Sequence, residues 1–395
     1  MTAYYVSTTG SDSNDGLSEG TAFLTPGYAS SQATAVGDVI YIKADGTYTT
    51  TNQTQNTSNG PMLLSAGVSV EGYGSTVGDG TKAVLNNGSQ DYSGGAYGYI
   101  TSVGGEYRGT PNVIRHLDFQ MQNATEAYSG IILNVSSQTA CYVMDCDFTG
   151  GILGGAYGIG DRESWCAIRC RFLGGSGSAF YEGNLALNCY FTLTPNNTGA
   201  LDQFNSAHGC VFKNCGGASV INNSVTNCIF YNEDAYKKHH PVWPSTYVEG
   251  TRNGSVRNCI FWGFDDFGKM SITAGTNPVS WVMTDCLYGN FNNLFESGST
   301  APLDTFAWSN VQEVLEDPFV DAANNDFRID MTKAVSSQVL GMSGLGMTGV
   351  TGGIAGFGAA TYESSEPDAH YPFRFAASGD FESDVAKFHP LRENR

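Results

Sequence analysis

The sequence contains no stretch of about 18 consecutive apolar residues, the length that a membrane-spanning helix requires. Its first residues, Met1-Thr-Ala-Tyr-Tyr-Val-Ser, lack the basic segment and the apolar core of a secretory signal. We therefore expect no membrane association, and synthesis in the cytoplasm without an export signal.

Basic residues are scarce. There are 19 Lys and Arg residues against 38 Asp and Glu residues, and the formal net charge is -19. Phosphate binding requires clustered Lys and Arg, so this balance excludes nucleic acid as a partner. It is compatible with simple solubility, with cation binding and with the binding of neutral or basic glycans.

Charged residues of either sign are also few, at 14%, whereas Gly is abundant, with 50 residues. Asn, Ser and Thr are frequent as well. This composition favours a β structure with many turns over a bundle of amphipathic helices. No heptad pattern indicates a coiled coil.

The ten Cys residues include no C-x-x-C pair, which argues against a zinc site. Seven of them belong to a recurring motif in which a small or medium apolar residue precedes Cys by three positions and an aromatic residue follows it by two. The motif occupies Val143–Phe148, Ala167–Phe172, Ala186–Phe191, Ala207–Phe212, Val225–Phe230, Val256–Phe261 and Met283–Tyr288, with a version lacking Cys at Ile114–Phe119. We expect these thiols to be free and buried rather than paired in disulfides.

The spacing within the motif predicts a bend. Cys and Phe, two positions apart, share one face of a strand, and the apolar residue shares that face only if the chain turns before Cys. Asn188, Asn227 and Asn258 stand immediately before Cys, where a tight bend needs a residue that tolerates positive φ.

From Leu117 to Cys286 the motif advances 169 residues in seven steps, a mean of about 24. Three short strands and their bends fill that length, and stacked coils bring equivalent residues to about 4.8 Å. The sequence therefore predicts a right-handed parallel β-helix of about 11 to 12 coils, with one column of Cys and one of Phe inside it.

The repeat resembles that of the pectate-lyase-like right-handed parallel β-helix superfamily, including its Asn ladder. The segments Tyr4–Gly16 and Ala35–Tyr48 resemble the first coil of phage spike and surface β-helix proteins, in which the segment here at about Tyr28 to Ala35 forms a capping helix. The resemblance covers roughly residues 3 to 358. It implies a fold rather than an activity, because lyases, hydrolases, epimerases and adhesive proteins share it.

Three regions follow from these patterns. We assign residues 1–48 to an N-terminal cap and first coil, 49–358 to the β-helix and 359–395 to a C-terminal tail. Within the second region, Asp317–Asp321 and Asn325–Ile329 resemble the closing segment of such proteins. The tail contains five aromatic residues between Tyr371 and Phe388, so docking on a partner or on a sister chain competes with disorder.

Three acids precede the Cys motif in consecutive coils: Asp161, Glu182 and Asp202. We predict that they form a column of carboxylates suited to acid/base catalysis on a glycan, with Trp165 stacking on a sugar ring. A calcium ion is an option there, and no other cofactor or metal is indicated. The competing interpretation is a solvated outer face, and the calcium-binding aspartates and catalytic Arg of pectate lyases are not found.

A long insertion between Phe230 and Cys259 carries a second candidate site. Tyr236, His239, His240, Trp243 and Tyr247 are predicted to form a carbohydrate-binding or subunit-contacting patch, because loops on a rigid solenoid concentrate function. Adjacent His residues on a loop are poorly placed to share one zinc ion. The competing interpretation is a loop that covers the coil.

Three functions remain open. The first is a virion-associated spike or decoration protein, located in the virion, whose β-helix binds host-surface polysaccharide and whose tail contacts other virion proteins. The second is a polysaccharide lyase or glycoside hydrolase that uses Asp161, Glu182 and Asp202. The third is an extracellular adhesin on the cell surface. The resemblance to tail spikes further implies a homotrimer.

Overall fold

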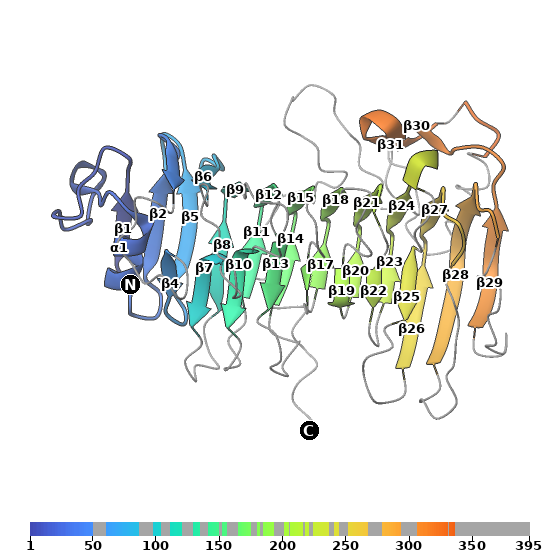
Figure 1. Ribbon diagram of the computed structural model, residues 1–395, viewed down its shortest axis with the longest axis horizontal. Helices are drawn as coiled ribbons and strands as arrows, with labels where there is room; N and C mark the ends of the chain where they lie inside the picture. The colour runs from blue at the N-terminus through green and yellow to red at the C-terminus, as the bar shows by residue number, and fades with distance from the viewer. Residues whose placement is uncertain are drawn as a thin grey trace, which may run out of the picture.

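The chain is a right-handed parallel β-helix, as the repeat predicted. The computed structural model describes residues 1–49, 61–86, 98–103, 111–120, 129–134, 141–149, 152–155, 165–174, 180–181, 185–192, 201–204, 206–215, 218–220, 224–236, 241–244, 252–267, 279–293, 306–330 and 332–335. The strands lie side by side along one long axis, in chain order from the N-terminal end (Figure 1). They form a 21-stranded and an 8-stranded sheet, and their pairings are parallel throughout.

Each full coil contributes one strand to each of three stacks. The first stack contains β1 (Ala3–Val6), β2 (Val39–Lys43), β5 (Ser69–Tyr73), β8 (Asn112–Arg115), β11 (Cys141–Met144), β14 (Trp165–Ile168), β17 (Leu185–Leu187), β20 (Ser206–His208), β23 (Ser224–Thr226), β26 (Arg252–Arg257), β28 (Val279–Gly289) and β29 (Phe306–Glu313). The second contains β3 (Thr47–Thr49), β6 (Ala83–Asn86), β9 (Leu117–Gln120), β12 (Asp147–Thr149), β15 (Arg171–Leu173), β18 (Tyr190–Thr192), β21 (Val211–Lys213), β24 (Ile229–Tyr231) and β27 (Ile260–Trp262), with the end of β28 beside β27. The third is the 8-stranded sheet, β4 (Met62–Leu64), β7 (Gly98–Val103), β10 (Ser129–Asn134), β13 (Ile152–Gly155), β16 (Phe180–Tyr181), β19 (Leu201–Phe204), β22 (Ala218–Val220) and β25 (Val242–Pro244).

A left-handed residue marks the bend between the first and second stacks. Asn188, Asn227 and Asn258 have φ of 53°, 54° and 50°, as their position before Cys predicted. The other coils place different residues in the same conformation: His116, Asp145, Arg169, Gly209, Asp285 and Asn310. The Asn258 side chain also donates from Nδ2 to Oδ1 of Asn227 at 3.3 Å, so these two amides are bonded across neighbouring coils.

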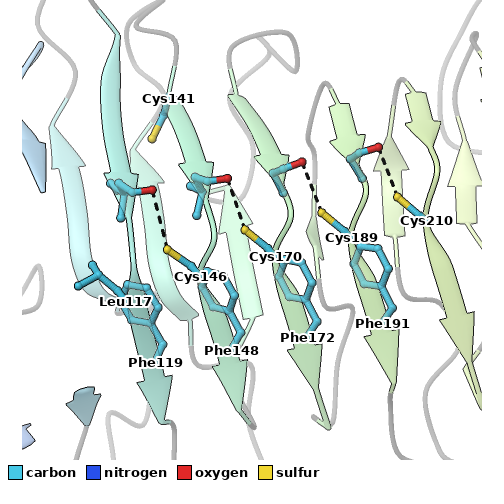
Figure 2. Close-up of a cluster of buried hydrophobic side chains, with 14 of the residues drawn as sticks. Leu117, Phe119, Cys141, Cys146, Phe148, Cys170, Phe172, Cys189, Phe191 and Cys210 are labelled. Atoms are coloured by element: carbon cyan, nitrogen blue, oxygen red, sulfur yellow. Dashed lines mark hydrogen bonds between the residues drawn. The ribbon is translucent and has the colours of Figure 1, made fainter. Parts of the chain in front are cut away.

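The Cys and Phe columns are inside the solenoid (Figure 2). Each Phe ring stacks on the next, with centroids 4.5–5.0 Å apart from Phe119 to Phe261. The thiols donate to backbone carbonyls of the preceding coil, for example from Cys170 to Val143 at 3.4 Å. All ten Cys residues are free and buried, as predicted. Burial raises the pKa of thiols such as Cys189 well above its usual value, which keeps them protonated.

A helix covers the first coils. Helix α1 (Pro26–Gln32) begins with Pro26 after Thr25, whose side chain accepts a hydrogen bond from the Tyr28 amide. It ends three residues earlier than the predicted limit at Ala35. A short 3-10 helix, η1 (Glu19–Thr21), precedes it. No helix among the described segments is long and apolar enough to cross a bilayer.

The predicted closing segment is an antiparallel hairpin of β30 (Phe319–Asp321) and β31 (Asp326–Ile329), joined by η5 (Ala322–Asn324). It lies beside the upper ends of β24 and β27 in Figure 1 and packs on the outer face of the second stack. The predicted boundary between the cap and the β-helix, at residue 48, adjoins residues 50–60, which lie outside the described residues. The predicted tail, residues 359–395, also lies outside them, within the range 336–395. These domain boundaries stay predictions.

Candidate functional site

The predicted carboxylate column is only partly within the described residues. Asp161 and Glu182 lie outside them. Asp202 is on β19 in the third stack, and its register partner on β16 is Tyr181, the residue before Glu182. The column and its catalytic role therefore stay predictions.

The predicted aromatic residues belong to different parts of the solenoid. Trp165 begins β14 in the first stack, opposite Cys141. Trp243 is on β25 in the third stack, opposite Ser219. Tyr236 ends the short helix η3 (Asp234–Tyr236). Of the remaining predicted residues, His239, His240 and Tyr247 lie outside the described residues, so a shared patch stays a prediction.

A different set of polar side chains lines the outer face of the second stack near its N-terminal end. We call Lys82, Asp118, Asp147 and Arg171 the charged row. Asp118 on β9 is in register with Asp147 on β12, which is in register with Arg171 on β15. Inward residues such as Phe119 and Phe148 alternate with them, so the fold itself directs these charges outward.

Asp147 is the fixed centre of the row. The Lys82 ammonium donates to its Oδ1 at 2.7 Å, Arg171 Nε donates to the same oxygen at 2.7 Å, and Arg171 Nη2 donates to Oδ2. Burial alone would raise the pKa of Asp147, but the hydrogen bonds and positive charges of Arg171 and Lys82 outweigh burial and hold this pKa below its usual value. Asp147 is thus a carboxylate that stays ionised to lower pH than an ordinary aspartate.

Asp118 differs from Asp147 although both are aspartates on one face. It is half-buried, and its Oδ2 accepts a hydrogen bond from Gln120 Nε2 at 2.8 Å. Burial, and to a lesser extent the negative charge of Asp147, raise the pKa of Asp118 above its usual value. A carboxyl group of this kind is suited to accept or donate a proton and to bond a hydroxyl group.

A second ion pair flanks the row at the bend. Arg169 donates from Nε and Nη2 to the two carboxylate oxygens of Asp145, at 2.7 and 2.6 Å. Among the described residues of this region, the three cations Lys82, Arg169 and Arg171 are balanced by three carboxylates, those of Asp118, Asp145 and Asp147. The surface therefore offers oriented donors and acceptors with little net charge, which fits hydroxyl-rich ligands better than polyanions.

Within the part of the chain that the structure describes, the hairpin of β30 and β31 covers this face only from Tyr190 onward. Tyr190, the register partner of Arg171, donates from its hydroxyl group to Asn325 Oδ1 at 2.9 Å, and Lys213 donates to the same oxygen at 2.8 Å. From there to Leu287 the outward residues pack under Phe319 and Ile329. The charged row begins where this cover ends.

The repeat contains a signal for this division that the sequence analysis missed. The residue between Cys, or Leu117, and the aromatic position is charged in the first three motifs, and it is Tyr190 in the fourth. It is then aliphatic in the rest: Val211, Ile229, Ile260 and Leu287. Outward aliphatic residues require a cover, whereas outward charges do not.

Among the described residues, no group of three or more His, Cys, Asp or Glu side chains is arranged to hold a metal ion. The suggested calcium site involves Asp161 and Glu182, which lie outside these residues, and it stays a prediction.

No protein-family model matches the chain, and no curated protein sequence matches it. Several solved structures share the architecture. A rhamnogalacturonan lyase is 13% identical, with a TM-score of 0.52, and the match covers 81% of this chain and 91% of that protein. A pectate lyase is 12% identical with a TM-score of 0.39, covering 85% and 90%, and a pectin methylesterase is 11% identical with a TM-score of 0.38, covering 86% and 97%.

At this level of identity the likeness concerns the fold. The chain shares the parallel β-helix fold of the rhamnogalacturonan lyase structure, which confirms the predicted resemblance in fold. The narrower resemblance to phage spike proteins stays a prediction.

Proposed function

We propose that the protein binds a polysaccharide along the outer face of the second stack, at the charged row. The observation that carries the proposal is Asp118, a half-buried carboxyl group with a raised pKa that lies beside rigid Asp–Arg pairs, on the part of a regular face that the described hairpin does not cover. Such groups bond paired hydroxyls in fixed geometry. The likeness in fold to a rhamnogalacturonan lyase is consistent with a glycan ligand.

The charge of the protein favours a neutral or basic glycan. Three cations and three carboxylates balance at the site, and the whole chain carries -19. A polyuronate is negatively charged and would be repelled by the net negative charge of the protein. The hydroxyl groups of a neutral glycan would instead exchange hydrogen bonds with water for equivalent hydrogen bonds with the protein.

The test is an array of neutral, uronic acid-containing and amino sugar-containing oligosaccharides, followed by titration calorimetry with those that bind. We expect Asp118→Ala to weaken binding by about tenfold or more, the usual effect of losing a hydrogen bond to a charged group. Glu313→Ala is the control, since Glu313 is exposed on β29, at the other end of the solenoid. Unchanged affinity in Asp118→Ala would contradict the proposal.

A second candidate is a polysaccharide-degrading enzyme, a lyase or a glycoside hydrolase. The raised pKa of Asp118 favours it, because a general acid or base works best with a pKa near the working pH. Asp147 is engaged by Lys82 and Arg171 and is poorly placed to act as a second catalytic carboxylate. The predicted acids Asp161, Glu182 and Asp202 supply the alternative set.

Product analysis of the glycans that bind decides between binding and cleavage. If the wild type cleaves a glycan, Asp118→Asn and the pair Glu182→Gln with Asp202→Asn separate the two proposed acid sets. Intact glycan after prolonged incubation would exclude the enzyme.

The more specific role, a virion-associated spike with partners bound through the tail, is supported by the aromatic composition of residues 359–395. Deletion of these residues should abolish attachment to particles and leave the circular dichroism spectrum of the solenoid unchanged. Retained attachment would contradict this role of the tail. The proposed homotrimer requires a mass measurement in solution.

A further inference from the structure

Three tyrosines lie together on the outer face of the first stack, at the N-terminal end of the solenoid. Tyr5 on β1 and Tyr41 on β2 are register partners, and their ring centroids are 5.5 Å apart with a 35° angle between the planes. Tyr73 meets both rings edge-on, with centroids at 6.4 and 6.3 Å. We call Tyr5, Tyr41 and Tyr73 the tyrosine platform.

The members of the platform differ in exposure. Tyr73 is 1% exposed and acts as a support, whereas Tyr5 and Tyr41 are half-buried. Packing edge-on against Tyr73 holds the two outer rings in fixed orientations. Two adjacent aromatic rings on consecutive parallel strands therefore form a rigid apolar surface of two partly overlapping rings, tilted by 35° to each other.

Hydrogen-bonding groups border this surface. Lys43 Nζ is 2.9 Å from Glu19 Oε2 and 6.0 Å from the centre of the Tyr73 ring. On the other side, Glu71 follows Tyr41 in the register row and Arg115 follows Glu71. Arg115 Nη2 donates to Glu71 Oε2 at 2.7 Å, and 44% of the Arg115 side chain remains exposed.

We propose that the tyrosine platform is a stacking site for a neutral oligosaccharide, separate from the charged row. A pyranose ring presents an apolar C–H face and a rim of hydroxyl groups. The Tyr5 and Tyr41 rings match the face, and the exposed parts of Lys43 and Arg115 match the rim. Each of these cations is paired with a carboxylate, so the border supplies hydrogen bonds with no net charge.

The shape of the row favours a sugar over a protein partner. Protein interfaces have an apolar centre larger than two half-buried rings. Here Glu71 and Arg115 follow Tyr41 and separate the two rings from Met144, the next apolar residue in the row. A small flat ligand covers the two rings alone, whereas a subunit contact along the row would also have to bury this ion pair.

The platform and the charged row are also independent. The platform belongs to β1, β2 and β5 of the first stack, and the row belongs to β9, β12 and β15 of the second. Two such sites on different faces would let one protein contact two segments of a polymer or two chains, which raises its avidity.

The test uses four hexasaccharides as probes: cellohexaose, maltohexaose, mannohexaose and chitohexaose. We expect Tyr41→Leu to weaken binding of at least one probe by about tenfold, because Leu keeps apolar volume but lacks a flat face. Tyr41→Phe should stay within about twofold of the wild type. Tyr142→Leu is the matched control, since Tyr142 is another half-buried tyrosine in the first stack, on β11.

A second measurement does not depend on the stability of a variant. In a saturation-transfer NMR experiment on the wild type, saturation of the aromatic protons of the protein should transfer to the sugar C–H protons of the bound probe. Absence of binding for all four probes, equal weakening by Tyr142→Leu, or a change in oligomeric mass with Tyr41→Leu would each overturn the proposal.

Asp118→Ala separates this proposal from the proposed function. A probe whose affinity falls with Tyr41→Leu and is unchanged by Asp118→Ala supports the platform. A probe that responds to Asp118→Ala alone leaves the charged row standing and overturns the platform.

Discussion

Truncation of one ring in the Phe column is the strongest test of the proposed origin of stability. Phe191 is fully buried and is stacked between Phe172 and Phe212, with centroids 4.8 and 4.9 Å away and planes within 4°. Phe191→Ala removes buried apolar area and leaves a cavity between rigid coils, so we expect the free energy of unfolding to fall by about 3–5 kcal/mol. Urea unfolding followed by circular dichroism at 25 °C measures it.

The end of the column provides the matched comparison. Phe119 is also fully buried, but it stacks on one ring, Phe148, at 5.0 Å, and its register partner on the other side is Leu85. An aromatic pair contributes about 0.5–1.5 kcal/mol beyond burial. Phe119→Ala should therefore lower the free energy of unfolding by less than Phe191→Ala does, and the difference should be about that amount. An equal or larger loss for Phe119→Ala would refute an energetic role for ring stacking.

Three further outcomes are expected. Without reductant, a thiol reagent should label all ten thiol groups after denaturation but at most Cys166, which is 9% exposed, in the native protein; rapid native labelling of several thiols would contradict the buried column. Asn227→Ala should lower the free energy of unfolding by about 1–2 kcal/mol, because alanine is strained at φ 54°, whereas Asn227→Gly should cost less. The folded-state pKa of Asp147 is lowered, so its pairing with Lys82 and Arg171 stabilises above the unfolded pKa of about 3.9 and is lost as pH falls further. The difference in unfolding free energy between wild type and Asp147→Asn should therefore shrink from pH 5 to pH 2, and a constant difference would show that the ion pairs contribute nothing.

The interior was predictable because each coil repeats the same packing problem. One apolar residue, one Cys and one Phe per coil must share a face, and this requirement appears in the sequence as a fixed spacing with Asn before Cys. The φ values of Asn188 and Asn258 and the complete burial of Cys189 follow directly from that pattern.

The candidate sites were harder to predict, since outward positions carry no packing constraint. Asp118 and Asp147 occupy equivalent positions in adjacent motifs, yet one has a raised and the other a lowered pKa. The difference depends on Arg171, the register partner of Asp147 in the next coil, and on Lys82, which is 65 residues from Asp147 in the chain. No local pattern in the sequence predicts the contact with Lys82.

By itself, the sequence determined the fold, the bend and the two interior columns, because stacking makes local spacing equivalent to spatial position. Only the tertiary structure decided how the outer faces are used. Among the described residues, the hairpin covers the second stack from Tyr190 onward and stops short of the charged row, and three coils bring Tyr5, Tyr41 and Tyr73 together. These contacts join residues far apart in the chain, whose proximity is set by where each coil closes and which segment packs over it.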